Sequence, residues 1–422
     1  MFERIFKLSE HKTTVKTEVM AGITTFMTMA YILAVNPSVL GSTGMDTTAV
    51  LLATALASCL GTLCMAFMAN LPFALSAGMG LNAFMAYTVV AGYGYSWQVA
   101  LLAVFIEGLI FIVLSLTNVR EAIFNAIPLT LKKGVSVGIG LFIAFIGLQN
   151  SGLCVDSATL VGIISFPENF HTAGICALLT LIGLFFTAVF YTRKMKGAIL
   201  YGILLTWILG MLCQVTGLYV PTPDAGFYSL FPSWGMTDFS KLGLTFGQCF
   251  NVDFSAVGIV NFIVVIFSFL FVDIFDTLGT LIGVATKAKM LDKDGKLPGI
   301  KPALLADSIA TSAGAILGTS TTTTFVESAS GVAVGGRTGL TALVTGILFL
   351  VSTLFAPIFT AIPSFATAPA LIMVGFLMVG TVTEISFDLD NLTESIPAYL
   401  AIIAMPLFYS ISEGISLGVI SY

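Results

Sequence analysis

Charge is what this sequence lacks most. Only 9% of its 422 residues are Asp, Glu, Lys or Arg, whereas roughly 25% is usual for soluble domains. Hydrophobic residues make up 57% of the chain, and apolar runs of about 20 residues, long enough to cross a bilayer, recur along it. The composition excludes a soluble globular domain and predicts a polytopic membrane protein.

Histidine is also scarce, and the cysteines follow no metal-binding pattern. The two histidines, His11 and His171, have no other plausible ligand nearby in the sequence, and the six cysteines include no CxxC pair. We therefore expect no metal site and no cofactor, and we expect the cysteines to act as small buried hydrophobic residues. The net charge of −5 gives no indication of nucleic-acid binding.

Motifs of intramembrane enzymes are missing as well. The chain has no HExxH, no GxGD, no GxSG with a histidine partner and no Cys–His arrangement. Asp273 and Asp276 lack a matching catalytic partner motif. The sequence therefore predicts a protein that is not an enzyme.

The few basic residues are grouped in a way that predicts the topology. They lie at 4–16, 120–133, 193–196, 287–301 and Arg337, and even numbers of apolar segments separate these groups. All groups then share one face, which the positive-inside rule makes cytoplasmic. Lys241 stands apart, in an external loop. We expect a multi-pass protein of the cell membrane with a cytoplasmic N-terminus and no cleaved signal peptide.

The apolar segments repeat in a common order in the two halves of the chain. Expected helices are 18–40, 47–68, 72–90, 97–117, 133–150, 172–191, 196–214, 257–284, 301–317, 321–335, 338–357, 366–383, 393–410 and a start at 412. FNAIP at 124–128 returns as FTAIP at 359–363, and LLATALASCLGT at 51–62 resembles the start of LLADSIATSAGAILGT. Seven segments per half is an odd number, so the second half must be inverted, as in many secondary transporters. In this register the chain stops early in the fourteenth helix, which suggests a C-terminal truncation.

Two segments at corresponding positions are too rich in Gly, Ser and Thr to face lipid. They are NLPFALSAGMGLNAFMAY at 70–87 and GTSTTTTFVESASGVAVGG at 318–336. Irregular backbone survives at membrane depth only where protein or a wet cavity covers it, and such paired interruptions indicate a substrate site near the midplane. We expect a half-helix starting near Phe325. Glu327 lies in the hydrocarbon region, where a carboxylate costs at least about 2.5–3.5 kcal/mol, so we expect it to bind substrate or to carry a proton.

A second acidic site lies in FSFLFVDIFDTLGTLIGVA, residues 267–285. Asp273 and Asp276 are three residues apart and share a helix face, which Thr277 extends. Asn82 is the polar residue of the first interrupted segment. Further candidates are the aromatic residues Phe84 and Phe325, which could stack on a flat ligand, and Ser328 beside Glu327. For two other intramembrane acids, Glu107 and Asp307, we expect packing and structural hydrogen bonds.

These motifs together resemble the purine permeases of the nucleobase–cation symporter-2 superfamily, in particular the adenine/guanine/hypoxanthine permeases of the AzgA-like branch. The resemblance rests on KTEVMAGITTFMTMAYILAVNPSVLG, SAGMGLNAFMAYTVV, FVDIFDTLGTLIGVA and GTSTTTTFVESASGVAVGGRTGLTALVTG, and it extends over essentially the whole chain. It implies an all-α, UraA-like fold of seven plus seven inverted helices, with short extended pieces in helices 3 and 10. It also implies proton-coupled purine uptake by an elevator-like motion.

The resemblance divides the chain into a core and a gate domain. The core is 1–117 and 257–358, the gate is 118–215 and 359–422, and 216–256 forms the external loop. The family's acids of helices 8 and 10 fall on Asp273 and Glu327, and its helix-3 asparagine on Asn82. Protons are the implied coupling ions, with Asp276 as a further proton-coupling candidate. Homodimerisation is left open.

A purine is flat and edged with N–H donors and lone pairs, which suits this set of side chains. We expect Asp273 and Glu327 to accept two N–H groups and Asn82 to serve an acceptor. Burial disfavours a charged carboxylate, so one of the two acids can take a proton. The alternative is an anion transporter of the related sulfate/bicarbonate type, although two carboxylates suit an anion poorly.

Overall fold

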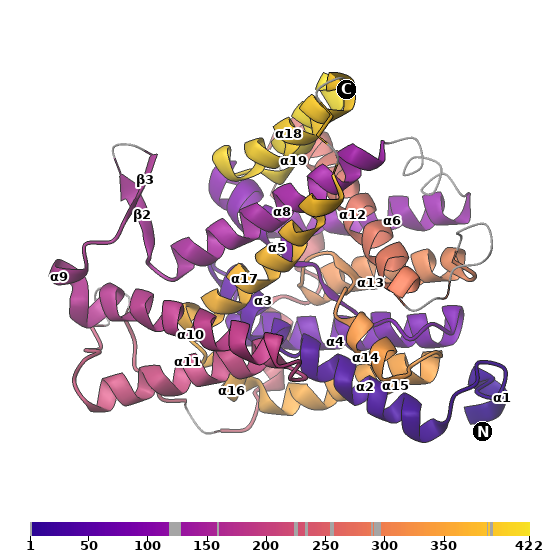
Figure 1. Ribbon diagram of the computed structural model, residues 1–422, viewed down its shortest axis with the longest axis horizontal. Coiled ribbons are helices and arrows are strands. Elements are labelled where there is room, and N and C mark those ends of the chain that lie inside the picture. The colour runs from indigo at the N-terminus through magenta and orange to yellow at the C-terminus, as the bar shows by residue number, and fades with distance from the viewer. Residues whose placement is uncertain are drawn as a thin grey trace.

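The computed structural model describes residues 2–117, 128–157, 160–222, 227–232, 235–253, 257–287, 290, 297–385, 387–388 and 391–422. The FNAIP motif, apart from Pro128, and the basic residues Arg120, Lys289, Lys293 and Lys296 lie outside the described residues. The described part is nearly all helical (Figure 1). The only strands in it form two short antiparallel pairs.

The first half of the chain contains seven membrane segments after the short helix α1 (Phe2–Phe6). Its helices are α2 (Val15–Met29), α3 (Ile32–Gly41), α4 (Thr47–Cys64, continued by a π-helical turn Met65–Ala69), α5 (Met79–Ala83, continued by Phe84–Gly92), α6 (Trp97–Leu116), α8 (Leu129–Asn150), α9 (Phe166–Asn169), α10 (Ile175–Thr192) and α11 (Ala198–Val215). Strand β1 (Leu75–Ala77) precedes α5, and a hairpin of β2 (Cys154–Ser157) and β3 (Leu160–Ile163) follows α8. Side-chain caps mark several helix starts, as where Ser96 accepts a hydrogen bond from the Val99 N–H.

The second half repeats this order. Its elements are α12 (Ile259–Lys287), α13 (Ile300–Leu317), β4 (Thr322–Thr324), α14 (Ser328–Val334), α15 (Gly339–Ser352), α16 (Ala356–Thr360), α17 (Ser364–Val379), α18 (Leu392–Leu407) and α19 (Ile411–Ser421). In the described part of the chain, the third and the tenth of the fourteen membrane segments each consist of a short strand followed by a short helix, as the sequence predicted. The expected half-helix begins at Ser328, three residues later than predicted, because the strand and its turn occupy 322–327.

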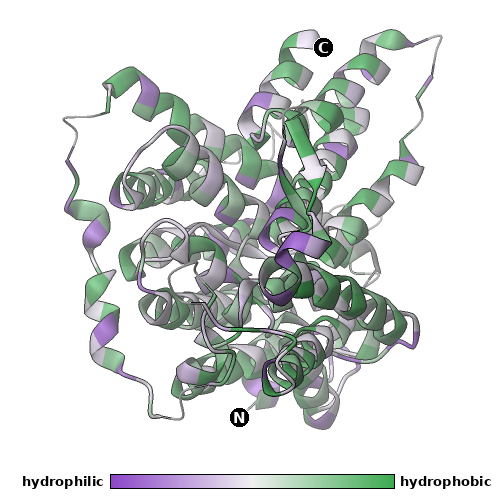
Figure 2. Cartoon of the chain, turned by 90° about the vertical axis from the view of Figure 1, so that its left-hand side faces the viewer, coloured by the Kyte–Doolittle hydropathy of each residue, from purple (hydrophilic) through white to green (hydrophobic). Residues whose placement is uncertain are grey.

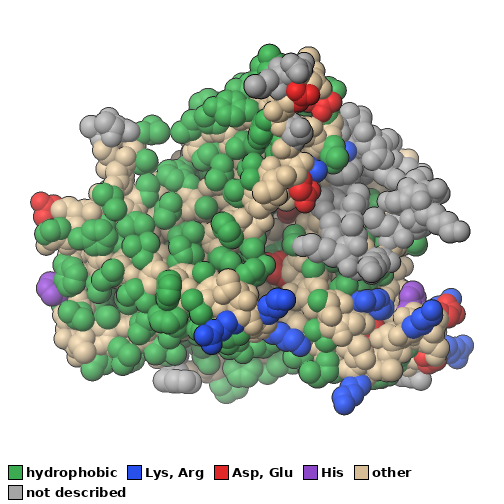
Figure 3. Space-filling view, viewed as in Figure 1, with side chains coloured by type: hydrophobic (Ala, Val, Ile, Leu, Met, Phe, Trp, Pro, Cys, Tyr) green, Lys and Arg blue, Asp and Glu red, His purple; other side chains and the backbone are tan. Residues whose placement is uncertain are grey.

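The surface composition fits a membrane-embedded bundle. Ten of the described helical segments are long and apolar enough to cross a bilayer, and Met79–Gly92, Leu392–Leu407 and Ile411–Ser421 are shorter apolar helices. Figure 2 shows several helices nearly end-on, with hydrophobic residues predominating. In Figure 3 hydrophobic side chains cover most of the visible face, and basic side chains gather toward its lower right. The chain is therefore a multi-pass membrane protein with the predicted seven-plus-seven fold.

The helices pack in two groups. In the larger group, α4 packs on α13 and α15, α2 packs on α14 and α15, and α6 packs on α12 and α13. In the smaller group, α8 packs on α17 and α18, and α10 packs on α11 and α17. Both members of the β1–β4 pair lie in the larger group. Segments far apart in sequence are therefore neighbours throughout (Figure 1).

The contact between α8 and α17 depends on two facing glycines. A Cβ added to Gly140 would lie 2.7 Å from the carbonyl oxygen of Gly375, and one added to Gly375 would lie 2.4 Å from that of Gly140. Small residues let membrane helices approach closely enough for backbone contact. Helices α8 and α17 are therefore held backbone to backbone at this point.

The start of α4 is tied to the external loop through Asp46. Its carboxylate accepts a hydrogen bond from the Ala49 backbone N–H at 3.0 Å and contacts Lys241 Nζ at 3.0 Å. Partial burial alone would raise the pKa of Asp46, but these two hydrogen bonds hold the pKa below its ordinary value. Lys241, the one basic residue outside the predicted cytoplasmic groups, therefore has an acidic partner.

Asp46→Ala is expected to lower the free energy of unfolding by about 1 kcal/mol at pH 7, the usual cost of losing an N-cap. Because the pKa of Asp46 is lowered in the fold, its contribution is present above an unfolded pKa of about 3.9 and is lost as the pH falls through the folded value. Thermal unfolding of the parent protein and of Asp46→Ala in detergent, from pH 7 to pH 3, measures this difference in stability. A difference from the parent protein that stays constant down to pH 3 would contradict it.

Candidate functional site

A short antiparallel strand pair lies at the centre of the candidate site. Strand β1 pairs with β4, so that residues from the third and tenth segments lie side by side. The backbone N–H of Phe325 extends the pairing by donating to the carbonyl oxygen of Ala74 at 3.0 Å. Each strand leads into a short helix, α5 after β1 and α14 after β4. The interruptions predicted from the sequence therefore meet each other inside the protein.

The run of hydroxyl residues ahead of Phe325 anchors this irregular backbone. Residues 319 to 324 are all fully or almost fully buried, and most of them contact a different helix. The contacts are Thr319 with Asn36 (2.9 Å) and Thr54 (3.1 Å), Ser320 with Asn82, Thr321 with Glu107 (2.9 Å), and Thr323 with Thr277 (2.6 Å). These contacts tie the segment to the surrounding helices, and the Thr311 hydroxyl satisfies part of its backbone by donating to the Thr322 carbonyl oxygen at 3.0 Å.

Glu327 lies directly after the strand pair, at the start of α14. Its Oε1 accepts a hydrogen bond of 2.8 Å from the hydroxyl of Tyr31. Tyr31 is almost fully buried and stands at the break between α2 and α3. Glu327 is half-buried as a residue, and one of its carboxylate oxygens is fixed by Tyr31.

Asp276, on α12, faces the same region. Its Oδ2 would lie 3.2 Å from a Cβ added to Gly78, the residue that joins β1 to α5. The charge of Asp276 interacts with those of both Asp273 and Glu327, and it also acts on Tyr31. Asp276 is half-buried, like Glu327. Asp276 and Glu327, both from the second half of the chain, therefore lie near the strand pair.

Asp273 is held in a buried hydrogen-bonding network one helical turn away. Thr277 Oγ1 lies 2.7 Å from Asp273 Oδ1, 2.6 Å from Thr323 Oγ1, and 3.3 and 3.2 Å from the two carboxylate oxygens of Asp307. All four residues are almost fully buried. The structural hydrogen bond expected for Asp307 is confirmed, and Asp273 shares that network.

Asn82 lies on α5 and is fully buried. Ser320 donates to its side-chain oxygen, while its Nδ2 lies 3.5 Å from the Ala77 carbonyl oxygen and 3.9 Å from Met79 Sδ. The amide oxygen is therefore engaged, and the Nδ2 group has only long contacts. In this arrangement Asn82 can act as a hydrogen-bond donor.

The aromatic and serine candidates lie around the strand pair. Phe84 is fully buried and packs edge-to-face on Phe269, with ring centroids 4.9 Å apart. Phe325 is 6% exposed, and Ser328 Oγ accepts the Ala74 N–H at 3.0 Å. In this conformation Phe84 and Ser328 have protein partners, so both contribute to packing around the strands.

The predicted convergence of Asp273 and Glu327 on one site stays a prediction: Glu327 follows β4 directly, and Asp273 lies in the buried network around Thr277. Asp276, three residues after Asp273 on α12, has its Oδ2 beside Gly78 at the junction of β1 and α5. Glu107 is fully buried and accepts from Thr321, in line with the packed interface expected for it. Tyr31 was not singled out by the sequence, because a tyrosine in an apolar run carries no sign of its partner.

The chain closely resembles several known permeases. It is 47% identical to a putative permease of Methanocaldococcus jannaschii, over 100% of this chain and 91% of that protein. It is 46% identical to the guanine/hypoxanthine permease PbuG of Bacillus subtilis, over 99% and 92%. It is 42% identical to the adenine permease AdeP of Escherichia coli, over 100% and 89%.

Solved structures of anion transporters share the fold. The transmembrane domain of a cyanobacterial bicarbonate transporter, BicA, matches with a TM-score of 0.64 and 16% identity, covering 96% of this chain and 97% of that one. Murine Solute Carrier 26 family member A9 in the inward-facing state matches with a TM-score of 0.64 and 12% identity, covering 96% and 67%. At these identities the likeness concerns the fold alone.

Residues 16–416 match the xanthine/uracil permease model, described as Permease family. This match spans almost the whole chain, and the relatives named above are transporters, so the protein is a transporter and not an enzyme. These findings show that the chain belongs to the permease family of the nucleobase–cation symporter-2 superfamily, among its purine permeases.

Proposed function

We propose that the protein takes up purine nucleobases, hypoxanthine and guanine first and adenine as a further candidate, together with protons across the cell membrane. The observation that carries this proposal is that Asp276 of α12 and Glu327 at the start of α14 both lie beside the β1–β4 pair, whose two strands come from opposite halves of the chain. The names of relatives that are 42–47% identical support the purine class. The grouping of basic residues supports a cytoplasmic N-terminus.

The proposed binding mode follows from the hydrogen-bonding groups. Asp276 and Glu327 accept two purine N–H groups, and the Asn82 amide donates to a ring nitrogen or carbonyl oxygen. Phe84 and Phe325 contribute apolar surface on either side. A site that pairs with the N–H groups and lone pairs of a base discriminates strongly against bases with a different hydrogen-bonding pattern, because its own polar groups would be left unpaired. Shape alone discriminates less. Asp273 and Thr277 support the site from the buried network rather than through direct contact with the base.

Proton coupling is assigned to the same acids. A carboxylate in a dry site is costly while it is charged, so uptake of a proton by Glu327 or Asp276 lowers the cost of carrying the base through the membrane. Asp273 lies next to Asp276 and extends the set of acids that can share that proton. Interacting acids of this kind titrate together rather than one by one.

The proposed transport step is a movement of the larger helix group, which holds the site, against the smaller one. In this proposal the larger group takes the role of the expected core domain and the smaller group that of the expected gate domain. Contacts between them include Tyr87 with Asn150 (3.2 Å) and the Thr88 hydroxyl with the Tyr409 carbonyl oxygen (3.1 Å). Such contacts must break and re-form in each cycle if the motion is elevator-like.

Tyr31→Phe is expected to raise the KM for hypoxanthine roughly tenfold, because hydrogen bonds to charged groups contribute about 1.5–3 kcal/mol. The protein should stay folded, since phenylalanine keeps the ring. Initial uptake rates over a range of hypoxanthine concentrations measure the effect. Tyr201→Phe on α11, whose side chain is 37% exposed, is the control. An unchanged KM and pH profile in Tyr31→Phe would remove Tyr31 from the site.

The direct test of the proposal is competition. Purified protein in liposomes with an imposed pH gradient is given labelled hypoxanthine, and unlabelled guanine, adenine, xanthine, uracil and sulfate are added in turn. We expect guanine to compete strongly, uracil and sulfate to fail, and uptake to collapse when a protonophore removes the gradient. Uptake of labelled sulfate without hypoxanthine uptake would support the anion-transporter alternative instead.

A further inference from the structure

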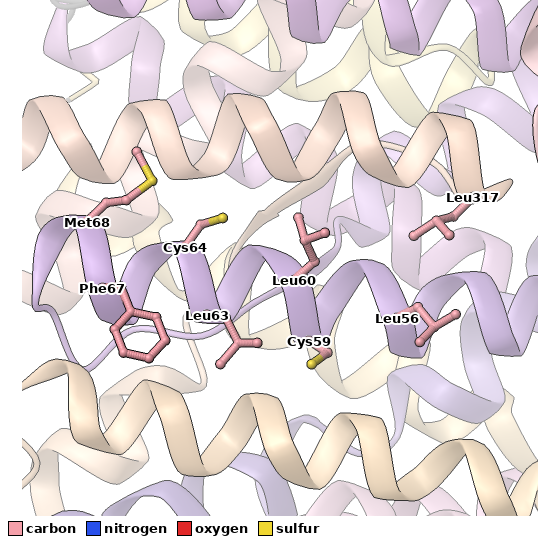
Figure 4. Close-up of a pocket in the computed structure, with 8 residues that line it drawn as sticks. All are labelled: Leu56, Cys59, Leu60, Leu63, Cys64, Phe67, Met68 and Leu317. Carbon is pink, nitrogen blue, oxygen red and sulfur yellow. The ribbon is translucent and has the colours of Figure 1, made fainter.

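An apolar groove runs along the outer side of α4 in the larger helix group. Figure 4 shows its side chains in two rows along α4 and its π-helical continuation, with Leu317 at the end of the neighbouring helix α13. The groove has a volume of about 600 Å³ and is lined by apolar and cysteine side chains alone. Leu60, Phe67 and Met68 within it are 38%, 57% and 38% exposed. The groove therefore lies open on the membrane-facing surface.

The length of the groove matches one leaflet of a bilayer. From Leu56 to Met68 there are twelve residue steps, which is about 18 Å at roughly 1.5 Å per residue. The hydrocarbon core of a bilayer is about 30 Å thick, so one leaflet measures about 15 Å. The groove ends where the membrane span Thr47–Ala69 ends. It is therefore suited to a single acyl chain that starts at this end of α4.

A polar pocket begins where the lining of the groove stops. Met68 lines the groove, and the next two residues, Ala69 and Asn70, line a second pocket of about 450 Å³, whose polar side chains are His11, Asn70 and Arg337 and whose remaining lining includes Leu71, Met290 and Leu297. It lies at the level expected for lipid headgroups, because the span has just ended. An apolar groove one leaflet long, followed by a pocket with polar side chains, fits the acyl chain and the headgroup of a phospholipid.

The charges at the pocket favour an anionic headgroup. Arg337 Nη1 donates to the carbonyl oxygens of Val332 (2.7 Å) and Gly336 (2.6 Å), and its other guanidinium N–H groups have no partner among the described residues. The nearby acid Glu18 is fully buried and already accepts the backbone N–H groups of Arg337, Thr338 and Thr341. An arginine with spare donors and a histidine can bind a phosphate.

The amphipathic helix α1 closes the same end. Phe6 packs on Phe67 with ring centroids 5.9 Å apart, while Phe2 and Ile5 are 41% and 42% exposed. A short helix with exposed apolar residues and basic neighbours is typical of a segment at the membrane interface. It would hold the lipid between the groove and the membrane surface.

We propose that this groove and pocket form a binding site for one anionic phospholipid, with an acyl chain along α4 and the phosphate at His11 and Arg337. The site belongs to the helix group that carries the strand pair, so the lipid would move with that group. The proposal does not depend on which substrate the protein carries.

The test uses the full chain in mild detergent with phosphatidylglycerol or phosphatidylcholine that carries a photoreactive group on one acyl chain. We expect phosphatidylglycerol to label peptides containing residues 56–68 at least fivefold more than phosphatidylcholine does. Leu60→Trp should reduce this labelling at least fivefold, and His11→Ala should reduce the preference for phosphatidylglycerol to less than twofold. Leu109→Trp on α6, where Leu109 is 44% exposed, should change neither.

Three results would overturn the proposal. They are labelling spread evenly over the lipid-facing helices, equal labelling by the two lipids in the parent protein, and labelling that persists in Leu60→Trp. If Leu60→Trp fails to fold, Leu60→Phe is the second variant and should give an intermediate loss. A change in oligomer mass in Leu60→Trp with unchanged labelling would mean that the groove binds a second copy of the chain instead.

Discussion

Replacing Glu327 by Gln is expected to abolish uphill, proton-driven uptake of hypoxanthine, with initial rates lowered by at least about 100-fold. The amide keeps the size of the side chain and can still accept the Tyr31 hydroxyl hydrogen, which now reaches Oε1 at 2.8 Å. It cannot take up a proton or offer a charged acceptor to a purine N–H, which is worth about 1.5–3 kcal/mol. Uptake into liposomes with and without a pH gradient measures the loss.

The matched control for this variant is Glu413→Gln. Glu413 is exposed in the first turn of α19, in the smaller helix group, and the substitution there should leave uptake unchanged. A Glu327→Gln protein that still accumulates hypoxanthine with the parent pH dependence would show that Glu327 takes no part in coupling. Exchange of labelled for unlabelled hypoxanthine separates a role of Glu327 in substrate binding from a role in proton coupling, because exchange requires binding but no net proton movement.

Asp276→Asn is expected to weaken hypoxanthine binding by roughly 10–100-fold, as the loss of a hydrogen bond to a charged group would predict. The reason is its position, because Asp276 Oδ2 lies beside Gly78 at the junction of β1 and α5. Equilibrium binding of labelled hypoxanthine to the purified protein measures the effect. Asp156→Asn on the exposed strand β2 is the control.

The same experiment separates Asp276 from Asp273. Because Asp273 accepts from Thr277 within the buried network, Asp273→Asn should lower thermal stability more than it lowers affinity. The opposite pattern, with affinity lost in Asp273→Asn and kept in Asp276→Asn, would make Asp273 the substrate acid that the family resemblance implied.

Most of the architecture could be predicted from the sequence because a membrane imposes strong rules. A helix expected at 301–317 is found at Ile300–Leu317, and one expected at 97–117 is found at Trp97–Leu116. Apolar runs of fixed length and clustered basic residues carry this information directly. The two interrupted segments could be recognised because an excess of Gly, Ser and Thr has no place on a lipid-facing helix.

The details of the site could not be predicted in the same way. Spacing places Asp273 and Asp276 on one face of α12, but only the packing of α12 against α6 and β4 decides what each acid contacts. Tyr31 and Ser320 reach their partners across distances of 296 and 238 residues in sequence. No local pattern contains information about contacts of that kind.

The β1–β4 pair also has a consequence for how the chain is made. While a ribosome has delivered only the first seven segments, the main-chain amide and carbonyl groups of residues 75–77 have no β4 to bond to. Such groups are costly in the bilayer interior, so nascent protein must delay burying them or shelter them with a chaperone or the insertion machinery. Synthesising the two halves as separate polypeptides in one cell should therefore yield stable product only when both are present.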